Sequence, residues 1–248
     1  MDKHAITTPR LRMFAGPNGS GKSTLKRVIP DDLLGIYINP DDIEKDIAQF
    51  DFLDLQVYGV DTTQEEIIAF FNQSTLLQKA NLLDAASFLK FSDHKLSFFE
   101  ISVNAYFAAA CADFIRRKLL EKRVTFTFET VMSAPDKIEI LHTAQRLGYR
   151  TYLYYIATDD VGINETRVQQ RVAAGGHDVP EDKIVSRYYK SLLQLPQAIK
   201  ASNRAYIFDN SGTEAIWVCE ITDGCKTEYK QDSVPDWVYR YVVEGMAG

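Results

Sequence analysis

The chain has 248 residues, of which 46% are hydrophobic and 12% aromatic, and its formal net charge at pH 7 is −6. This length suits one large α/β domain or a core domain with an insertion, and the hydrophobic content excludes global disorder. The acidic balance, with no stripe of lysine and arginine, argues against a nucleic-acid partner.

Five short apolar segments alternate with helical patterns along the chain. Each is too short for a helix and is rich in Tyr, Phe, Ile or Thr, which is typical of β-strands. The alternation predicts a parallel sheet covered by helices on both faces, with ligands collecting at the carboxyl ends of its strands. The segments are residues 11–15, 36–39, 125–128, 151–157 and 205–208.

The first of these segments is followed by a glycine-rich loop that matches the pattern G-x-x-x-x-G-K-[ST]. Its glycines let successive backbone N–H groups point at a phosphate chain, and the helix behind it adds the positive end of its dipole. We expect Lys22 to reach the β- and γ-phosphates of a nucleotide and Ser23 to hold Mg²⁺. The predicted nucleotide-binding residues are Gly16, Pro17, Asn18, Gly19, Ser20, Gly21, Lys22, Ser23 and Thr24.

Between residues 51 and 103 the pattern of alternating strands and helices is interrupted. Thr62 and Thr63 precede an acidic turn and an apolar run, which indicates the start of a helix. We expect a largely helical insertion at 51–103, either a cap over the substrate or extra helices at the sheet edge. Residues 104–123 repeat apolar side chains at helical spacing and predict a further helix.

In the C-terminal part, two strands that are adjacent in the sequence are predicted to pair with each other. Residues 215–221 and 226–230 flank Thr222-Asp223-Gly224, which predicts a β-hairpin, and Pro235 opens a short helix. Together the elements predict one α/β domain over residues 1–248 with a P-loop NTPase fold. In this fold a parallel sheet is flanked by helices and carries the helical insertion at 51–103 and the C-terminal hairpin.

Two acidic positions follow predicted strands. Asp41 and Asp42 come after the second strand, where a carboxylate either accepts a proton from a substrate hydroxyl as general base or caps the next helix. Glu129 ends the third strand between apolar residues, and a buried carboxylate requires a partner. That partner is a substrate hydroxyl, a hydrated Mg²⁺ or a backbone amide.

A pair of arginines stands on a predicted helix. Arg167 and Arg171 are four residues apart and therefore share a face. Two glycines and His177 follow, and a second helix then carries Arg187. This arrangement predicts either a lid that delivers guanidinium groups to the γ-phosphate or a solvated helical hairpin. For His177 we expect a hinge or lid contact, because metal ligation lacks partner residues.

Compartment and redox state are suggested by what the sequence lacks. Cys111, Cys219 and Cys225 are odd in number and show no C-x-x-C spacing, so we expect reduced thiols. The first ten residues contain no apolar signal core, and no apolar run approaches membrane-spanning length. We therefore expect a cytoplasmic protein with no membrane partner.

The order of these motifs resembles the zeta-toxin family of P-loop kinases. The matching stretches are the loop at 16–24, Tyr-Ile-Asn-Pro-Asp at 37–41, Phe-Glu-Thr at 128–130, Gly-Tyr at 148–149, Arg-Val at 171–172, Gly-Gly-His-Asp-Val-Pro at 175–180, Arg-Tyr at 187–188, Ser-Leu at 191–192 and Asp-Asn-Ser at 209–211. The loop alone is generic, whereas the later motifs in this order are more specific.

The resemblance implies a kinase that moves the γ-phosphate of ATP or GTP, with Mg²⁺, to a hydroxyl of a nucleotide sugar such as UDP-N-acetylglucosamine. In family terms Asp41 is the base, Lys22 anchors the phosphates, and Glu129 with Thr130 contacts the substrate. Arg171 and Arg187 form the charge-stabilising pair. An antitoxin, where one exists, is expected to be a separate protein.

The sequence departs from the family pattern in two places, which leaves the acceptor open. Family members often have a threonine two positions after the glutamate, where this chain has Val131, and Val131 cannot hydrogen-bond a sugar. The segment 51–103 also lies where substrate is enclosed. One alternative is a kinase for another hydroxyl acceptor, such as a nucleoside or an antibiotic. The other is a non-catalytic, nucleotide-gated binding module.

Overall fold

The computed structural model describes residues 8–176 and 178–247. The chain forms two compact units, one made of Met1–Gly35 and Thr127–Gly248 and the other of Ile36–Phe126. The second unit therefore includes the predicted insertion at 51–103 and extends beyond it on both sides. No helix in the described part of the chain is long and apolar enough to cross a membrane.

The first unit is built on a mostly parallel sheet. Its strands lie in the order β10-β9-β8-β7-β1-β6. β7 pairs in parallel with β1 on one side and β8 on the other, whereas β9 and β10 are antiparallel. This confirms the predicted sheet and the C-terminal hairpin. The strands are β1 (Arg10–Ala15), β6 (Phe126–Thr130), β7 (Arg150–Ala157), β8 (Arg204–Asp209), β9 (Ile216–Thr222) and β10 (Lys226–Tyr229).

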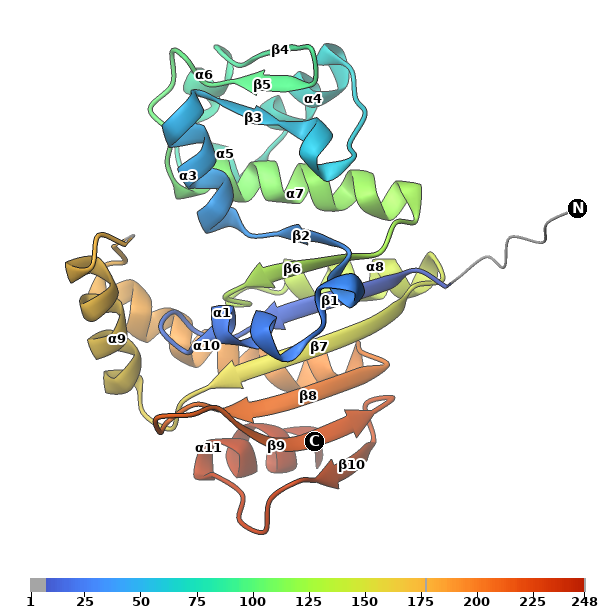
Figure 1. Ribbon diagram of the computed structural model, residues 1–248, viewed down its shortest axis with the longest axis vertical. Coiled ribbons are helices and arrows are strands. Elements are labelled where there is room, and N and C mark those ends of the chain that lie inside the picture. Colours follow the sequence, from blue (N-terminus) through green and yellow to red (C-terminus); the bar gives the residue numbers. More distant parts are fainter. Residues whose placement is uncertain (1–7, 177, 248) are drawn as a thin grey trace, which may run out of the picture. The chain divides into compact units, whose positions relative to one another are not determined.

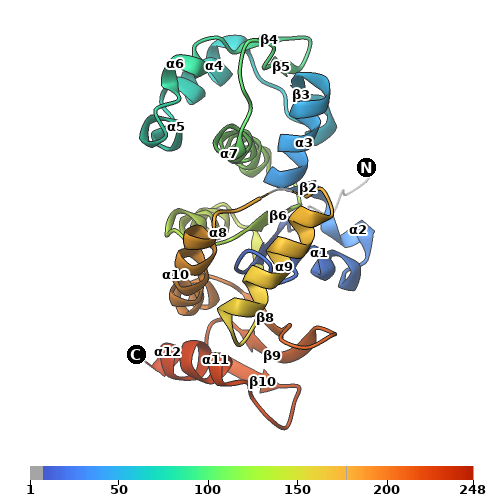
Figure 2. The ribbon, with the colours of Figure 1, turned by 90° about the vertical axis from the view of Figure 1, so that its left-hand side faces the viewer.

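Helices cover both faces of this sheet. Figures 1 and 2 show α8, α10 and α11 on one side of the strands and α1 and α2 on the other, while α9 stands at the edge toward which β1, β7 and β8 point. The helices are α1 (Lys22–Leu25), the 3₁₀ helix η1 (Lys26–Val28), α2 (Asp31–Leu34), α8 (Asp136–Arg146), α9 (Val161–Ala173), α10 (Glu181–Lys200), α11 (Asp236–Val238), the π-helix η3 (Tyr239–Glu244) and α12 (Gly245–Ala247).

The core of the first unit follows from the alternation of β7. Thr151, Leu153 and Tyr155 point to the same face and are all fully buried. The Tyr155 hydroxyl lies 3.0 Å from the Ser191 hydroxyl on α10, and its ring centroid lies 6.1 Å from that of Trp237. These contacts hold α10 and α11 against the sheet.

The second unit combines helices with a small antiparallel sheet. The predicted helices are present, and in addition three strands of three residues each form a sheet in the order β3-β5-β4. The elements are β2 (Ile36–Ile38), α3 (Pro40–Phe50), β3 (Phe52–Asp54), the 3₁₀ helix η2 (Leu55–Tyr58), α4 (Gln64–Asn72), α5 (Thr75–Lys79), α6 (Leu83–Ala86), β4 (Lys90–Ser92), β5 (Lys95–Ser97) and α7 (Ala105–Lys122).

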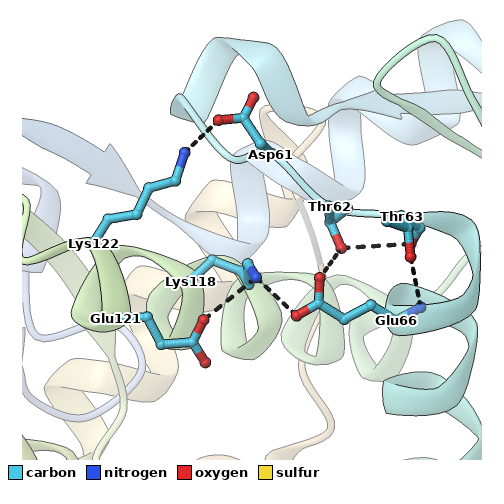
Figure 3. A network of polar contacts seen from close by, with 7 residues as sticks. All are labelled: Asp61, Thr62, Thr63, Glu66, Lys118, Glu121 and Lys122. Carbon is cyan, nitrogen blue, oxygen red and sulfur yellow. Dashed lines mark hydrogen bonds and ion pairs between the residues drawn. The ribbon is translucent and has the colours of Figure 1, made fainter.

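A network of ion pairs joins the start of α4 to the end of α7 (Figure 3). Lys118 donates to Glu66 at 2.8 Å, and Lys122 donates to Asp61 at 2.6 Å. Glu66 also accepts from the Thr62 hydroxyl, and its own backbone N–H donates to the Thr63 hydroxyl that caps α4. The hydrogen bond from Lys118 lowers the pKa of Glu66, and this charged contact raises the pKa of Lys118. The junction therefore pairs partly buried lysines with exposed carboxylates.

Candidate functional site

The predicted phosphate-binding loop joins β1 to α1. Three of its glycines have positive φ, at 150° for Gly16, 76° for Gly19 and 96° for Gly21. Gly21 is also the N-cap of α1, so the helix begins directly under the loop. A loop of this shape brings backbone N–H groups and a helix N-terminus to one place, which is the arrangement that binds phosphate.

Each of these glycines also lies against a neighbouring segment. A Cβ on Gly16 would lie 2.0 Å from the carbonyl oxygen of Ile156, and one on Gly19 would lie 2.5 Å from that of Asn164. On Gly21 it would lie 2.3 Å from the Asn210 side-chain nitrogen. The loop is therefore packed against β7, α9 and the segment after β8, and no larger residue fits at these positions.

The side chain of Lys22 is held over the loop by carbonyl groups of the loop backbone. Its ammonium group donates to the carbonyl oxygens of Gly16 at 2.8 Å and Pro17 at 2.9 Å. The Thr24 hydroxyl donates to the Gly21 carbonyl at 2.6 Å, which closes the first turn of α1. Ser23 is exposed on that turn. The ammonium group of Lys22 and the exposed hydroxyl of Ser23 therefore lie beside the predicted phosphate-binding loop.

Two asparagine side chains fix the loop from outside. Asn164, on α9, donates to the Asn18 carbonyl at 2.5 Å, and its own side-chain oxygen accepts from the Thr158 hydroxyl. Asn210, after β8, donates to the Ser20 carbonyl at 2.8 Å. Both asparagines are buried. The sequence carries no sign of a role for Asn164 and shows Asn210 only as part of a motif, because their partners lie 146 and 190 residues away.

The end of β6 lies beside the start of the loop. The Gly16 N–H donates to the Thr130 carbonyl at 3.3 Å, so the neighbouring residue Glu129 reaches the same edge of the sheet. Glu129 is only 7% exposed. The Thr130 hydroxyl accepts from the Met132 N–H at 3.0 Å, which holds the turn after the strand. Val131, between them, is half-buried.

The predicted arginine-bearing helices are α9 and α10, and they share a small apolar cluster. It consists of the buried residues Val168, Val179 and Ile184, with Val172 packed against them. Arg171 and Arg187 are half-buried on this hairpin. His177, for which a hinge or lid contact was expected, lies outside the described residues.

The expectation for Arg167 needs correction. Its guanidinium does not stand with Arg171 as a group for delivery to phosphate, because it donates to the carbonyls of Asn210 at 2.7 Å and Gly212 at 3.0 Å. These two bonds use the planar fork of the guanidinium to tie α9 to the turn after β8. Arg167 therefore has backbone partners within the fold, whereas the sequence spacing left open a phosphate-directed role or a solvated helical hairpin.

Residues after the parallel strands support this arrangement. The Tyr188 hydroxyl on α10 donates to the Thr158 carbonyl at 2.6 Å, and burial raises the pKa of Tyr188, which keeps it a neutral donor. The Asp209 carboxylate accepts from Trp237 at 2.7 Å and from the Ser211 hydroxyl at 2.8 Å. The turn that carries Asn210 is thus fixed on both sides.

In the second unit, Asp41 lies in the first turn of α3. The helix is capped by Asn39, whose side-chain oxygen accepts from the Asp41 N–H at 3.0 Å, so the alternative that an aspartate caps this helix is wrong. Asp41 and Asp42 are both exposed, and Asp42 lies 3.9 Å from Lys45. Within the described part of the chain, no ion pair engages the Asp41 carboxylate.

The described residues contain no cluster of three or more His, Cys, Asp or Glu side chains arranged to hold a metal ion. Mg²⁺ does not require one, because it commonly binds through one or two protein oxygens together with substrate phosphates and water. The exposed hydroxyl of Ser23 in the first turn of α1 is a donor of this kind. The residues present therefore fit a nucleotide-bound Mg²⁺.

Comparison with known families supports the sequence resemblance. Residues 101–221, just under half of the chain, match the family model described as Zeta toxin. This confirms the resemblance to zeta-toxin P-loop kinases over that part of the chain. The match includes Glu129, Arg171 and Arg187, and it begins after the phosphate-binding loop and Asp41.

A curated relative matches a shorter stretch. An uncharacterized protein of Haemophilus influenzae is 33% identical over 69 residues, which are 28% of this chain and 49% of that protein. The chain thus matches about half the length of this relative, and the match carries no statement of activity.

Two crystal structures of one complex share the fold. AvrRxo1-ORF1:AvrRxo1-ORF2 with sulphate ions has a TM-score of 0.52 and 13% identity, over 91% of this chain and 62% of that chain. The same complex with ATP has a TM-score of 0.51 and 12% identity, over 90% and 61%. The chain spans less than two thirds of those proteins, and at this identity the likeness establishes the P-loop kinase-like fold alone.

Proposed function

We propose that this chain is a Mg²⁺-dependent small-molecule kinase that transfers the γ-phosphate of ATP or GTP to a hydroxyl of a nucleotide sugar such as UDP-N-acetylglucosamine. The observation that carries the donor half is the geometry of the loop, in which Lys22 lies over three left-handed glycines at the start of a helix. The acceptor half is supported by the match of residues 101–221 to the Zeta toxin family.

In this proposal the loop N–H groups and Lys22 bind the β- and γ-phosphates, and Arg171 and Arg187 stabilise the charge that develops on the transferring group. A Mg²⁺ held by the Ser23 hydroxyl and the phosphates would neutralise further negative charge. Glu129 and Thr130 orient the acceptor at the carboxyl end of β6. The buried position of Glu129 supports this role, because water competes weakly for a buried carboxylate.

Asp41 is the proposed base. Its carboxylate removes the proton from the acceptor hydroxyl while the hydroxyl oxygen forms a bond to the γ-phosphorus, and the bond from that phosphorus to the β-phosphate oxygen breaks. The nucleoside diphosphate leaves with the electron pair. The exposed position of Asp41, separate from the cap formed by Asn39, supports its availability for proton transfer.

The neighbouring aspartate offers a matched control for this role. We expect Asp41→Asn to reduce kcat by about 10²–10⁴-fold, the usual contribution of a positioned general base. Asp42→Asn, in the same exposed helical turn, should stay within about threefold of the wild type. Initial rates with labelled ATP and unchanged circular dichroism spectra would test this. Full activity of Asp41→Asn would remove Asp41 as the base.

The acceptor is tested separately with a panel of sugar nucleotides, nucleosides and hydroxylated antibiotics. Transfer to UDP-N-acetylglucosamine supports the proposal, and transfer only to another compound supports a kinase with a different acceptor. Val131 is the observation that favours this second candidate, because a half-buried valine offers no hydrogen bond to a sugar. Nucleotide binding without transfer to any compound would indicate a binding module instead.

A separate antitoxin protein and a cytoplasmic location are part of the same proposal. The family match supports the first, and the free cysteines Cys111, Cys219 and Cys225 are consistent with a reducing compartment. Co-purification of the chain with the product of a neighbouring gene, and loss of phosphate transfer in that complex, would support the antitoxin.

A further inference from the structure

We propose that Asn164 and Asn210 are positioning residues for the bound nucleotide, because their side-chain amides set the direction of the backbone N–H groups in the phosphate-binding loop. Asn164 donates to the Asn18 carbonyl at 2.5 Å, and Asn210 donates to the Ser20 carbonyl at 2.8 Å. The inference rests on the nucleotide-binding half of the proposed function. It adds two residues that orient the loop and do not contact the reacting atoms.

The argument starts from the planarity of the peptide bond. In a trans peptide the C=O of one residue and the N–H of the next lie in one plane and point in opposite directions. A side chain that holds the Asn18 carbonyl outward therefore turns the Gly19 N–H inward, and the bond to the Ser20 carbonyl does the same for the Gly21 N–H. Among the described residues, neither of these two N–H groups has a hydrogen-bond acceptor.

The two amides are themselves fixed in orientation. The Asn164 side-chain oxygen accepts from the Thr158 hydroxyl, so its nitrogen must face the loop. The backbone of Asn210 is held on both sides, because its N–H donates to the Ala157 carbonyl at 2.8 Å and its carbonyl accepts from Arg167 at 2.7 Å. Both asparagines are at least nine-tenths buried, so water competes poorly for the loop carbonyls.

The consequence is that α9 is attached to the loop at its first turns. Asn164 and Arg167 lie on the same helix, and together they contact the loop directly and through Asn210. The helix that carries Arg171 is therefore anchored at its N-terminal end.

The test is direct measurement of ATP affinity by calorimetry, at a temperature at which all variants are folded. We expect Asn164→Ala and Asn210→Ala each to raise the Kd for ATP about tenfold, since each leaves a loop carbonyl without its donor and frees the adjacent N–H group to turn away from the phosphates. The value of kcat should change less than threefold, because Lys22 and Asp41 are retained. A uniform loss of binding of this kind appears in Kd and KM and not in kcat.

Asn203→Ala is the matched control. Asn203 precedes β8, and its side-chain oxygen accepts from the Thr151 N–H at 2.9 Å, at the opposite end of the strand from Asn210. Its loss should lower stability without changing the Kd for ATP. Equal weakening of ATP binding by Asn203→Ala, or Kd values within twofold of wild type for both test variants, would overturn the proposal.

Two milder variants keep the test decisive where an alanine variant does not fold. Thr158→Val retains the shape of the side chain and removes the donor that orients Asn164, and it should weaken ATP binding about threefold. Arg167→Lys retains the charge and loses the two-pronged contact with the carbonyls of Asn210 and Gly212. It should also weaken binding, and unchanged affinity in both variants contradicts the proposal.

The binding measurement also separates this inference from the proposed kinase activity. Wild-type protein that binds ATP but phosphorylates no acceptor would contradict the proposed reaction, and the asparagine variants would still decide the positioning role. Transfer activity with unchanged ATP affinity in the asparagine variants would contradict the positioning role and leave the reaction supported.

Discussion

The phosphate-binding loop and the junction between α4 and α7 are stabilised in contrasting ways. The loop is held by buried, neutral amides of Asn164 and Asn210 that donate to backbone carbonyls. The junction is held by ion pairs between partly buried lysines and exposed carboxylates, among them Lys118 with Glu66 and Lys122 with Asp61 (Figure 3). Buried neutral bonds are insensitive to salt and pH, whereas exposed ion pairs are weak and respond to both.

This contrast suits the role proposed for the loop. A loop that presents N–H groups to phosphate, as we propose, requires fixed geometry, and buried neutral hydrogen bonds supply it. The α4–α7 junction has no such requirement, and its charges contribute local stability and solubility. The predictions that follow test each side of the contrast, beginning with the loop.

The largest effect is expected from crowding the loop. Gly19→Ala should lower the free energy of unfolding by about 2–5 kcal/mol, combining a left-handed backbone cost of about 1–2 kcal/mol with overlap of the Asn164 carbonyl 2.5 Å away. Nucleotide binding should be lost with it, because the overlap displaces the loop. Urea unfolding and ATP calorimetry measure the two effects.

Gly175→Ala is the control for that prediction. Gly175 also has a positive φ, at 84°, but nothing lies within 4 Å of its added Cβ. It should therefore carry only the backbone cost of about 1–2 kcal/mol and bind ATP normally. Equal destabilisation by both substitutions would show that the packing around Gly19 is unimportant.

A medium loss of stability is expected from removing the buried indole donor of the Asp209 carboxylate. Trp237→Phe removes the indole N–H that donates to Asp209 at 2.7 Å, and a hydrogen bond to a buried charge contributes about 1.5–3 kcal/mol. Trp217→Phe is the matched change at a ring that is 38% exposed and donates to a backbone carbonyl, and it should cost less than about 1 kcal/mol. Urea midpoints compare them, and a reversed order would contradict the assignment of Asp209 as a buried anchor.

The larger strands and the loop were predictable from the sequence because their signals are local. The run before Gly16 is apolar and β-rich, and the glycines of the loop have a spacing that few other structures require. Asn104 and Thr63, directly before helical patterns, cap α7 and α4 as their residue types predict. In each case a few adjacent residues determine the element.

The small sheet and the asparagine contacts were not predictable, for different physical reasons. β3, β4 and β5 have three residues each, too few to show a two-residue period, and the turn between β4 and β5 uses Asp93 and His94 in left-handed conformations without the usual glycine. Asn164 and Asn210 act only through residues distant in sequence. Arg167 likewise meets its carbonyl partners across 43 and 45 positions.

The smallest effect is expected at the ion pairs of the second unit. Glu66→Gln removes the charge that pairs with Lys118 and should lower the free energy of unfolding at pH 7 by at most about 1 kcal/mol, the usual range for exposed pairs. Because the folded-state pKa of Glu66 is lowered, its contribution is present above about pH 4.5 and is lost as the pH falls below that value. The raised pKa of Lys118 implies a second loss at alkaline pH, above about 10.5.

Urea midpoints of wild type and Glu66→Gln should therefore differ between pH 5 and 9 and converge toward pH 3. Glu121→Gln is the control, since Glu121 contacts the same lysine at 3.3 Å with a side chain that is 64% exposed, and its effect should be smaller. Adding 1 M salt should shrink the Glu66 difference, because the Debye length falls to about 3 Å, and should leave the Trp237 difference unchanged. A Glu66 difference that persists at pH 3 and in high salt would mean that this junction, like the loop, is held by packing and neutral hydrogen bonds.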